Sequence, residues 1–530
     1  MNVSKSTEFM WCAVSAIVLT ISAGACTRSS DMISENAPNV ACAVSRATPK
    51  RDFRAFWIAA VRNIDWPSRE GLTVAEQQEE LRKWLDLAVR LRYNAVILQV
   101  RPVSDSFWPS PFAPWSEFLT GTQGTDPGYD PLAFAVAEAH RRNLELHAWF
   151  NPYRAARNTQ IDLLAPTHPA RLHRDWLVSY DNQLYFNPGV PAAREHIVDA
   201  IMDAVDRYDV DGVHLDDFFY PYPIAGETFA DTATYMQYGA GFTTLADWRR
   251  HNVDVFVEML SRRIKAVKPW VKFGISPFAV WRNASVDPQG SETSTDVQTY
   301  DDQYADTRRW LRENWIDYIA PQVYWAQDFQ RADYDKVVSW WVEQVRSSRA
   351  HLYIGQAAYK VGISNQSPGW ASPAELANHL AFNCKFPEVK GNIYFSAKDV
   401  RADRLGSISQ LGHTWYSRPA LPPIIPWLKA TPPLAVRDLQ INRKSHGVRL
   451  SWQAGSADTV SYAIYRHEAS SCDACRDLDA SHLIATVRRT EYLDAATSAD
   501  REFLYSVTAL DRVWNESEPV VLKSIPVLKR

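Results

Sequence analysis

The sequence predicts an α/β protein, in which a (β/α)8 barrel is followed by a small all-β domain. From residue 53 to about residue 397, short runs rich in Val, Ile, Leu, Phe and Tyr alternate with longer amphipathic stretches. A proline-rich segment then separates this region from short alternating strands. The chain of 530 residues is also longer than one ordinary domain.

Eight strand candidates are continuous apolar runs, as expected for strands that are covered on both faces. They are Phe53–Val61, Ala95–Pro102, Leu144–Pro152, Gly212–Phe219, Val271–Ala279, Tyr318–Trp325, His351–Tyr359 and Gly391–Ala397. Helices are predicted between them over residues 73–92, 191–208, 244–268, 333–348 and 373–386. We favour a closed barrel over residues 51–418. A doubly wound open sheet is the alternative, but no glycine-rich phosphate loop follows the first strand.

Residues 419–433 contain Pro422-Pro423 and Pro432-Pro433 and predict a stiff linker. Strands are predicted beyond it, over Val448–Trp452, Ser461–Arg466, Ile484–Val487 and Phe503–Leu510. Tyr505 stands where fibronectin-type sandwiches often carry their corner tyrosine. Residues 434–530 are therefore predicted to form a fibronectin type III-like domain, used for binding or spacing. Cys472 and Cys475 are too few ligands for zinc and predict a local disulfide.

Residues 1–26 have the pattern of an export signal. Lys5 is followed by an apolar stretch from Met10 to Ile21 that is too short to cross a bilayer. The small residues before Cys26 resemble a bacterial lipobox, in which this cysteine is lipidated; cleavage after Ala25 without lipidation is the alternative. Residues 27–50 are predicted to be a polar tether. We therefore expect an exported protein, held in the periplasm or at the outer membrane as a lipoprotein.

Composition narrows the class of ligand. The net charge of −4 argues against a nucleic-acid partner, because nucleic-acid-binding domains are usually basic. The chain has 21 Trp and 23 Tyr, and many of them lie beside Pro, Asn, Gln or Arg. A large aromatic core is one explanation. A groove that stacks sugar rings is the other, and it implies a polysaccharide partner.

The strongest chemical signal is the segment Asp209–Tyr220, in which an apolar strand ends in Asp216 and Asp217. Adjacent carboxylates in this position are costly unless they are used or paired. Alternation along the strand predicts that His214 and Asp216 share a face. Active sites of such barrels lie at the carboxyl ends of the strands. We therefore expect Asp216 and Asp217 in the active centre.

Hydrolysis of a glycosidic bond takes two carboxyl groups, one ionised and one protonated. We expect Asp216 to be the ionised group, acting as nucleophile or charge stabiliser. The acid is left open among Asp217, Asp301, Asp302 and Glu292, although Asp301 and Asp302 can equally cap the next helix. The residues expected to hold the sugar are Arg101, His147, Asn151, Arg154, His214, Gln322, Tyr324 and Trp325.

A metal site is the competing chemistry, since His147, His214, Asp216 and Asp217 are all metal-ligating residue types. Their spacing matches no common zinc signature. We therefore expect neither a metal nor another cofactor.

Several long motifs resemble the glycosyl hydrolase-like 10 family. They are Phe56–Ser68, Gln99–Pro102, His147–Arg154, Asp211–Asp217, Phe273–Phe278 with Trp281–Asn283, and Ala320–Trp325. The resemblance covers about residues 50–420 and implies a barrel glycosidase. It also implies kinship with envelope lipoproteins that act on peptidoglycan glycan strands, some of which carry a fibronectin-like domain. The pattern from Asp211 to Asp216 is similar to retaining glycosidases whose final Asp is the nucleophile.

The resulting hypothesis is a glycoside hydrolase that cuts a β-linked amino-sugar polymer of the bacterial envelope, above all peptidoglycan glycan. Two other functions stay open. One is a glycan-binding envelope protein without catalysis, and the other is a metal-dependent polysaccharide hydrolase or deacetylase.

Overall fold

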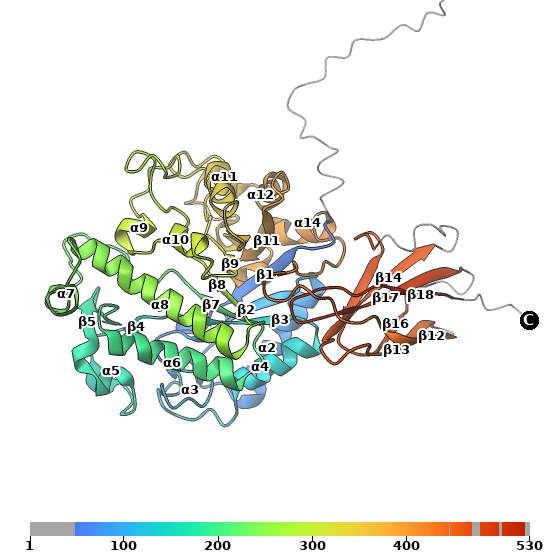
Figure 1. Ribbon diagram of the computed structural model, residues 1–530, viewed down its shortest axis with the longest axis horizontal. Coiled ribbons are helices and arrows are strands. Elements are labelled where there is room, and N and C mark those ends of the chain that lie inside the picture. The colour runs from blue at the N-terminus through green and yellow to red at the C-terminus, as the bar shows by residue number, and fades with distance from the viewer. Residues whose placement is uncertain (1–47, 445, 469–477, 498–500, 525–530) are drawn as a thin grey trace, which may run out of the picture. The chain divides into compact units, whose positions relative to one another are not determined.

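A computed structural model of the chain describes residues 48–444, 446–468, 478–497 and 501–524. Eight parallel strands close into a barrel in the order β1-β11-β10-β9-β8-β7-β3-β2 (Figure 1). They are β1 Phe53–Ile58, β2 Ala95–Arg101, β3 Glu145–Phe150, β7 Gly212–Leu215, β8 Lys272–Ile275, β9 Tyr318–Ile319, β10 His351–Gln356 and β11 Val389–Tyr394. Each lies within or overlaps one of the predicted runs. The predicted fold class is therefore confirmed, with strands shorter than the sequence suggested.

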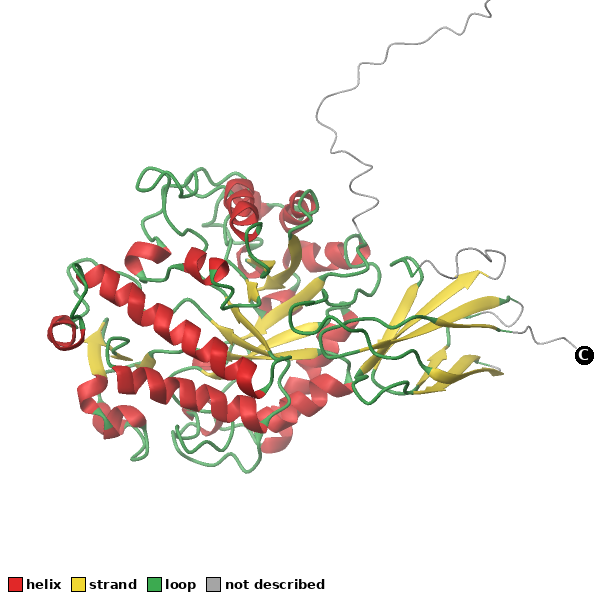
Figure 2. Ribbon diagram, in the orientation of Figure 1, coloured by secondary structure: helices red, strands yellow, loops and turns green. Residues whose placement is uncertain are grey.

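Helices cover the outside of the barrel (Figure 2). The larger ones are α2 Val74–Arg90, α4 Pro131–Arg141, α6 Pro191–Arg207, α8 Leu245–Val267, α11 Tyr334–Val345 and α12 Glu375–Asn383, and two shorter ones are α10 Thr307–Arg312 and α14 Ser407–His413. Short helices lie between them, namely α3 Glu117–Thr120, α5 Pro169–Leu172, α7 Thr232–Tyr238, α9 Thr299–Asp302 and α13 Ala397–Ala402. Local sequence signals determine where several of these helices begin. Thr73 and Glu76 form a capping box before α2, and Pro191 occupies the first turn of α6.

The barrel interior contains a directed chain of hydrogen bonds. Trp57 donates from Nε1 to Nε2 of His214 at 3.1 Å, so the proton of this ring lies on Nδ1 and points to the hydroxyl of Tyr318 at 2.9 Å. Tyr318 then donates to Nδ1 of His147 at 2.8 Å, and Nε2 of His147 lies 3.0 Å from Glu145. Every member of the chain therefore has a partner, which makes this polar interior stable.

Two glycines make room for this chain. A Cβ atom on Gly274 would lie 2.1 Å from ring atoms of Tyr318, and one on Gly212 would lie 2.7 Å from Nδ1 of His147. Both distances are far below van der Waals contact. Because glycine has no side chain, Gly212 of β7 and Gly274 of β8 leave the space that the rings of His147 and Tyr318 occupy.

A small antiparallel sheet is inserted after β3 and was not predicted. It contains β4 Arg154–Ala156, β6 Gln183–Phe186 and β5 Leu177–Tyr180, in the order β4-β6-β5. Because β4 begins only four residues after β3 ends, this sheet stands at the carboxyl end of the barrel. It is one of the elements that position the site.

The C-terminal region forms two antiparallel sheets, as the sequence predicted. One contains β12 Arg437–Lys444, β13 Gly447–Gln453 and β16 Glu491–Asp494, and the other contains β15 Leu483–Val487, β14 Ser461–Glu468, β17 Phe503–Leu510 and β18 Val520–Lys523. The hydroxyl of Tyr505 donates to Asp494 at 2.8 Å. Trp514, in the loop after β17, donates from its indole to Glu145 at the first residue of β3. The sheets therefore contact the barrel at the end opposite to the carboxyl ends of its strands.

Some predictions fall on residues that the structure does not describe. They are the export signal over residues 1–26, lipidation at Cys26, the tether apart from its last residues, and the disulfide between Cys472 and Cys475. Among the described residues, none of the helices has the length and apolar character of a membrane span.

Candidate active site

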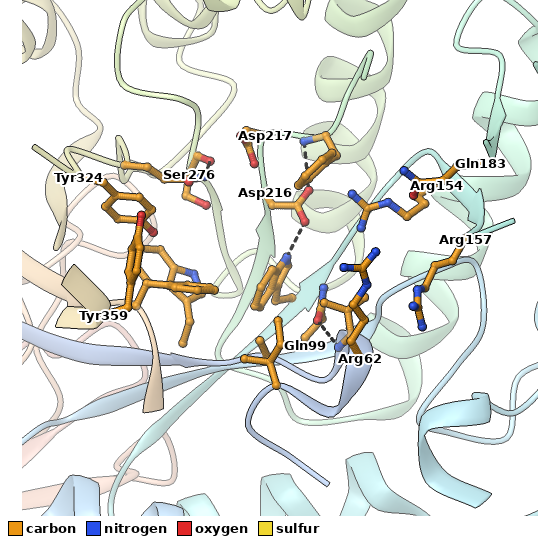
Figure 3. Close-up of a pocket in the computed structure, with 18 residues that line it drawn as sticks. Arg62, Gln99, Arg154, Arg157, Gln183, Asp216, Asp217, Ser276, Tyr324 and Tyr359 are labelled. Carbon is orange, nitrogen blue, oxygen red and sulfur yellow. Dashed lines mark hydrogen bonds between the residues drawn. The ribbon is translucent and has the colours of Figure 1, made fainter. Parts of the chain in front are cut away.

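A cavity of about 500 Å³ opens at the carboxyl ends of the barrel strands. Trp57 of β1, Gln99 of β2 and Trp149 of β3 contribute to its wall, and Asp216 follows directly after β7. The other lining residues are Ala59, Val61, Arg62, Ile64, Arg154, Arg157, Gln183, Asp217, Phe218, Ser276, Gln322, Tyr324, Tyr359 and Phe395. Figure 3 shows Asp216 between an aromatic side, with Tyr324 and Tyr359, and a side that carries Arg62, Arg154 and Arg157.

Three N–H groups donate to the carboxyl group of Asp216. Trp149 Nε1 and Asn151 Nδ2 reach Oδ2 at 3.0 and 3.1 Å, and the backbone N–H of Phe218 reaches Oδ1 at 3.2 Å. These donors favour the ionised form. Burial opposes them more strongly, and together with the neighbouring charge of Asp217 it raises the pKa of Asp216 to about 7. The carboxyl group is therefore poised to change its protonation state near neutral pH.

Asp217 is equally buried, but its surroundings differ. The hydroxyl of Tyr222 donates to its carboxyl group, and Gln303 Nε2 donates to its backbone carbonyl at 2.8 Å. Burial raises the pKa of Asp217, and hydrogen bonding by Tyr222 opposes this rise. Asp216 and Asp217 thus form a buried pair of acidic groups, and such a pair does not ionise in a single step.

The aromatic side of the cavity offers faces for stacking. The rings of Tyr324 and Tyr359 meet edge to face at 5.7 Å, and Tyr324 also lies 6.2 Å from Phe395. Gln322 Nε2 donates to the carbonyl of Ser276 at 2.8 Å, so two polar lining residues hold each other in place. Aromatic faces beside buried acids are typical of a sugar-binding cleft.

Comparison with known proteins shows to which protein family the chain belongs. Residues 52–372 match the family described as Glycosyl hydrolase-like 10. The chain belongs to the glycosyl hydrolase-like 10 family. It is therefore a glycosidase, and the resemblance seen in its motifs is confirmed.

Two curated relatives agree with this assignment. The chain is 47% identical over 486 residues to glycosyl hydrolase YngK of Bacillus subtilis, covering 90% of this chain and 94% of that protein. It is 40% identical over 362 residues to glycosyl hydrolase DigH of Escherichia coli K12, covering 64% of this chain and 82% of that protein. A solved glycoside hydrolase domain of PgaB (BpsB) from Bordetella bronchiseptica is 12% identical with a TM-score of 0.43, covering 68% of this chain and 98% of that domain.

The structure of this family member brings five of the sequence-predicted residues together around the cavity. They are Asp216, Asp217, Arg154, Gln322 and Tyr324. Asn151 lies just behind them, where it donates to Asp216. The sequence thus located the acidic pair and part of each side of the cavity.

Other predicted site residues lie elsewhere. His147 and His214 both face Tyr318 inside the barrel. Arg101 is buried and donates to the carbonyls of Asn151 and Pro152, so it supports the loop that carries Asn151. Trp325 packs edge to face on Phe278 at 5.4 Å. None of these four lines the cavity.

Asp302 also lies outside the cavity lining. It is the last residue of α9, and its Oδ2 accepts the backbone N–H of Gln298, the residue before that helix, at 2.7 Å. The next helix, α10, is capped by Asp306 and not by Asp302. The proposed metal ligands do not converge either, since the two histidines bind Tyr318. Among the residues that the structure describes, no group of three His, Cys, Asp or Glu side chains is placed to hold a metal ion.

Several site residues were missed. Arg157 and Gln183 come from the inserted sheet region, and Tyr222 and Gln303 come from loops far apart in the sequence. Arg157 lies three residues after the predicted Arg154, with only Ala155 and Ala156 between them. Nothing in the sequence pattern linked Gln303 to Asp217.

Proposed function

We propose that this glycosidase hydrolyses glycosidic bonds in peptidoglycan glycan strands, with Asp216 and Asp217 as its two working carboxyl groups. The observation that carries the proposal is the buried acidic pair in a cavity with an aromatic side. Two carboxyl groups in different protonation states are what glycosidic hydrolysis requires. The choice of substrate is supported by the motifs, whose resemblance implies kinship with envelope lipoproteins that act on peptidoglycan glycan strands.

Asp216 is the ionised member in this proposal. Its three N–H donors stabilise a negative charge at the place where a sugar cation develops. Like charges repel, so the pair holds one proton until both groups ionise. The proposal places this shared proton on Asp217, which then serves as the acid. In this division of roles Tyr222 orients the acid, because its hydroxyl donates a hydrogen bond to Asp217.

The test is direct incubation with purified peptidoglycan glycan strands and, in parallel, with poly-N-acetylglucosamine. We expect new reducing ends and shorter oligosaccharides from peptidoglycan glycan, detected by chromatography with mass spectrometry. Cleavage of the second polymer alone would overturn the substrate assignment. Binding of both polymers without any product would overturn the proposed activity.

We further propose that the enzyme acts outside the cytoplasm and is anchored through a lipid on Cys26. The support is the apolar stretch and the small residues before Cys26. Metabolic labelling with radioactive palmitate should mark the wild-type protein and not Cys26→Ser. Labelling of both proteins, or of neither, would contradict anchoring at this residue.

A further inference from the structure

One side of the cavity carries three arginines from two different loops. Arg62 lies in the 3-10 turn Val61–Asn63 after β1, whereas Arg154 begins β4 and Arg157 follows it. All three line the same cavity as Asp216. Figure 3 shows them on the side of Asp216 that faces away from Tyr324. A glycan in the cavity therefore meets aromatic rings on one side of the acids and guanidinium groups on the other.

The protein neutralises the positive charge of this arginine cluster only in part. None of the three guanidinium groups forms an ion pair with a carboxylate of the described residues. The Nε atoms of Arg154 and Arg157 are buried and have no hydrogen-bond partner there. A buried donor left without an acceptor costs about 1–3 kcal/mol, and more when it is charged. Arg154 has a hydrogen bond with Tyr185, but these two buried Nε donors have no acceptor among the described residues.

The three charges also lie close enough to repel one another. Burial is the main cause that lowers the pKa of Arg157, and repulsion by Arg62 and Arg154 adds to it. Glu117 acts in the opposite direction. Arg154 likewise lowers the pKa of Asp216, but less than burial raises it. The nearby acids thus compensate the positive charge of the three arginines only in part.

Aromatic rings hold two of the guanidinium groups in place. The guanidinium carbon of Arg154 lies 4.1 Å from the ring centre of Phe218, and that of Arg157 lies 5.7 Å from the ring centre of Phe118. Stacking on a ring uses the face of a guanidinium group and leaves its N–H edge available. The edges are suited to paired hydrogen bonds with a planar or tetrahedral anion.

We propose that Arg62, Arg154 and Arg157 form a subsite for an anionic substituent of the glycan, adjacent to the bond that is cleaved. The inference rests on the proposed function, because it uses the same cavity. Its ligand is a sugar that carries a carboxylate or a phosphate group. The subsite makes the enzyme select charged over neutral glycan units, while the aromatic side accepts either.

The experiment is a ligand-observed NMR titration, which measures weak binding without requiring cleavage. The probes are N-acetylmuramic acid, its neutral N-methylamide, and N-acetylglucosamine 6-phosphate beside N-acetylglucosamine. We expect at least one anionic sugar to bind about tenfold more tightly than its neutral counterpart. The carboxylate and phosphate arms identify which anion is preferred. The preference should shrink in 0.5 M salt, because screening weakens partly exposed charge pairs.

Variants assign this preference to the cluster. Arg62→Gln and Arg157→Gln should each reduce the ratio of anionic to neutral affinity at least threefold, with unchanged binding of the neutral sugar. Arg90→Gln, at the exposed end of α2, is the matched control and should keep the ratio. Arg157→Lys should retain part of the preference.

Two outcomes would overturn the subsite. One is equal affinity for anionic and neutral sugars in the wild-type protein. The other is a preference that both Gln variants keep, although circular dichroism shows that they are folded. Failure of the proposed function looks different, since a protein that cleaves no glycan but prefers the anionic sugar would still possess the subsite.

Discussion

The indole nitrogen of Trp149 donates a 3.0 Å hydrogen bond to Oδ2 of Asp216, and the same side chain forms part of the cavity wall. One residue therefore both shapes the space for a sugar and stabilises the charge of the carboxyl group. The pKa of Asp216 depends on this contact, because the hydrogen bond lowers it against the larger effect of burial.

Replacing Trp149 with Phe should raise the pKa of Asp216 further while keeping an aromatic ring in the wall. If ionised Asp216 is required, the acidic limb of kcat/KM near pH 7 should move up by about half a pH unit or more. A pH series of kcat/KM between 5 and 9 measures this shift. Trp281→Phe is the control, since Trp281 is equally buried but lies outside the cavity. If the acidic limb of the Trp149→Phe profile stays at the wild-type pH, Trp149 does not control the ionisation of Asp216 during catalysis.

Tyr222→Phe tests the role of Asp217. Loss of the hydroxyl donor should raise the pKa of Asp217, and it should therefore move the alkaline limb of the same pH profile upward. Tyr153→Phe removes a buried hydroxyl that has no hydrogen-bond partner among the described residues, and should leave the profile unchanged. A shift of the acidic limb alone would reverse the roles that we assign to Asp216 and Asp217.

The stability of the enzyme should depend on pH through Asp216. The raised pKa of Asp216 means that the folded state holds a proton between pH 4 and 7 that the unfolded chain has released. The free energy of unfolding should therefore fall as pH rises through this interval, and Asp216→Asn lacks this contribution. From pH 5 to pH 8, the variant should gain about 2 kcal/mol relative to the wild-type protein. Urea unfolding at both pH values measures the difference, and a constant difference would contradict the raised pKa.

Gly274→Ala should destabilise the barrel by about 3 kcal/mol, because its new methyl group would overlap the ring of Tyr318. Gly412→Ala is the matched control in helix α14, where nothing lies within 4 Å of the new atom. That change should be neutral or stabilise by up to about 1 kcal/mol. The midpoints of urea unfolding compare the two. Similar effects in both variants would mean that the interior is less tightly packed than the distances imply.

The fold could be predicted because covered parallel strands are continuous apolar runs, and eight of them alternate with helices. The acidic pair at the end of β7 could also be predicted, because two acids directly after an apolar strand have few structural explanations. The sequence could not show how deep a polar side chain lies inside the barrel. His147 and His214 share a face with Asp216, yet they lie below it and bind Tyr318.

The rest of the site comes from segments without periodic pattern. Arg157 and Gln183 depend on the inserted sheet β4-β6-β5, whose strands are only three or four residues long. Asp302 could be predicted as an acid or as a helix cap, whereas in the structure it is the last residue of α9 and accepts the backbone N–H of Gln298. Residue type alone does not decide which role such an acid has.

The most direct test of the central claim measures reducing ends released from peptidoglycan glycan by Asp216→Asn and by Asp254→Asn. Asp254 is a buried acid whose pKa is also raised to about 7, but it contacts Arg309 and Trp310 and lies outside the cavity. We expect Asp216→Asn to lose about a thousandfold in rate while it stays folded, and Asp254→Asn to stay within about threefold of the wild-type rate if it folds. Wild-type activity in folded Asp216→Asn would contradict the account.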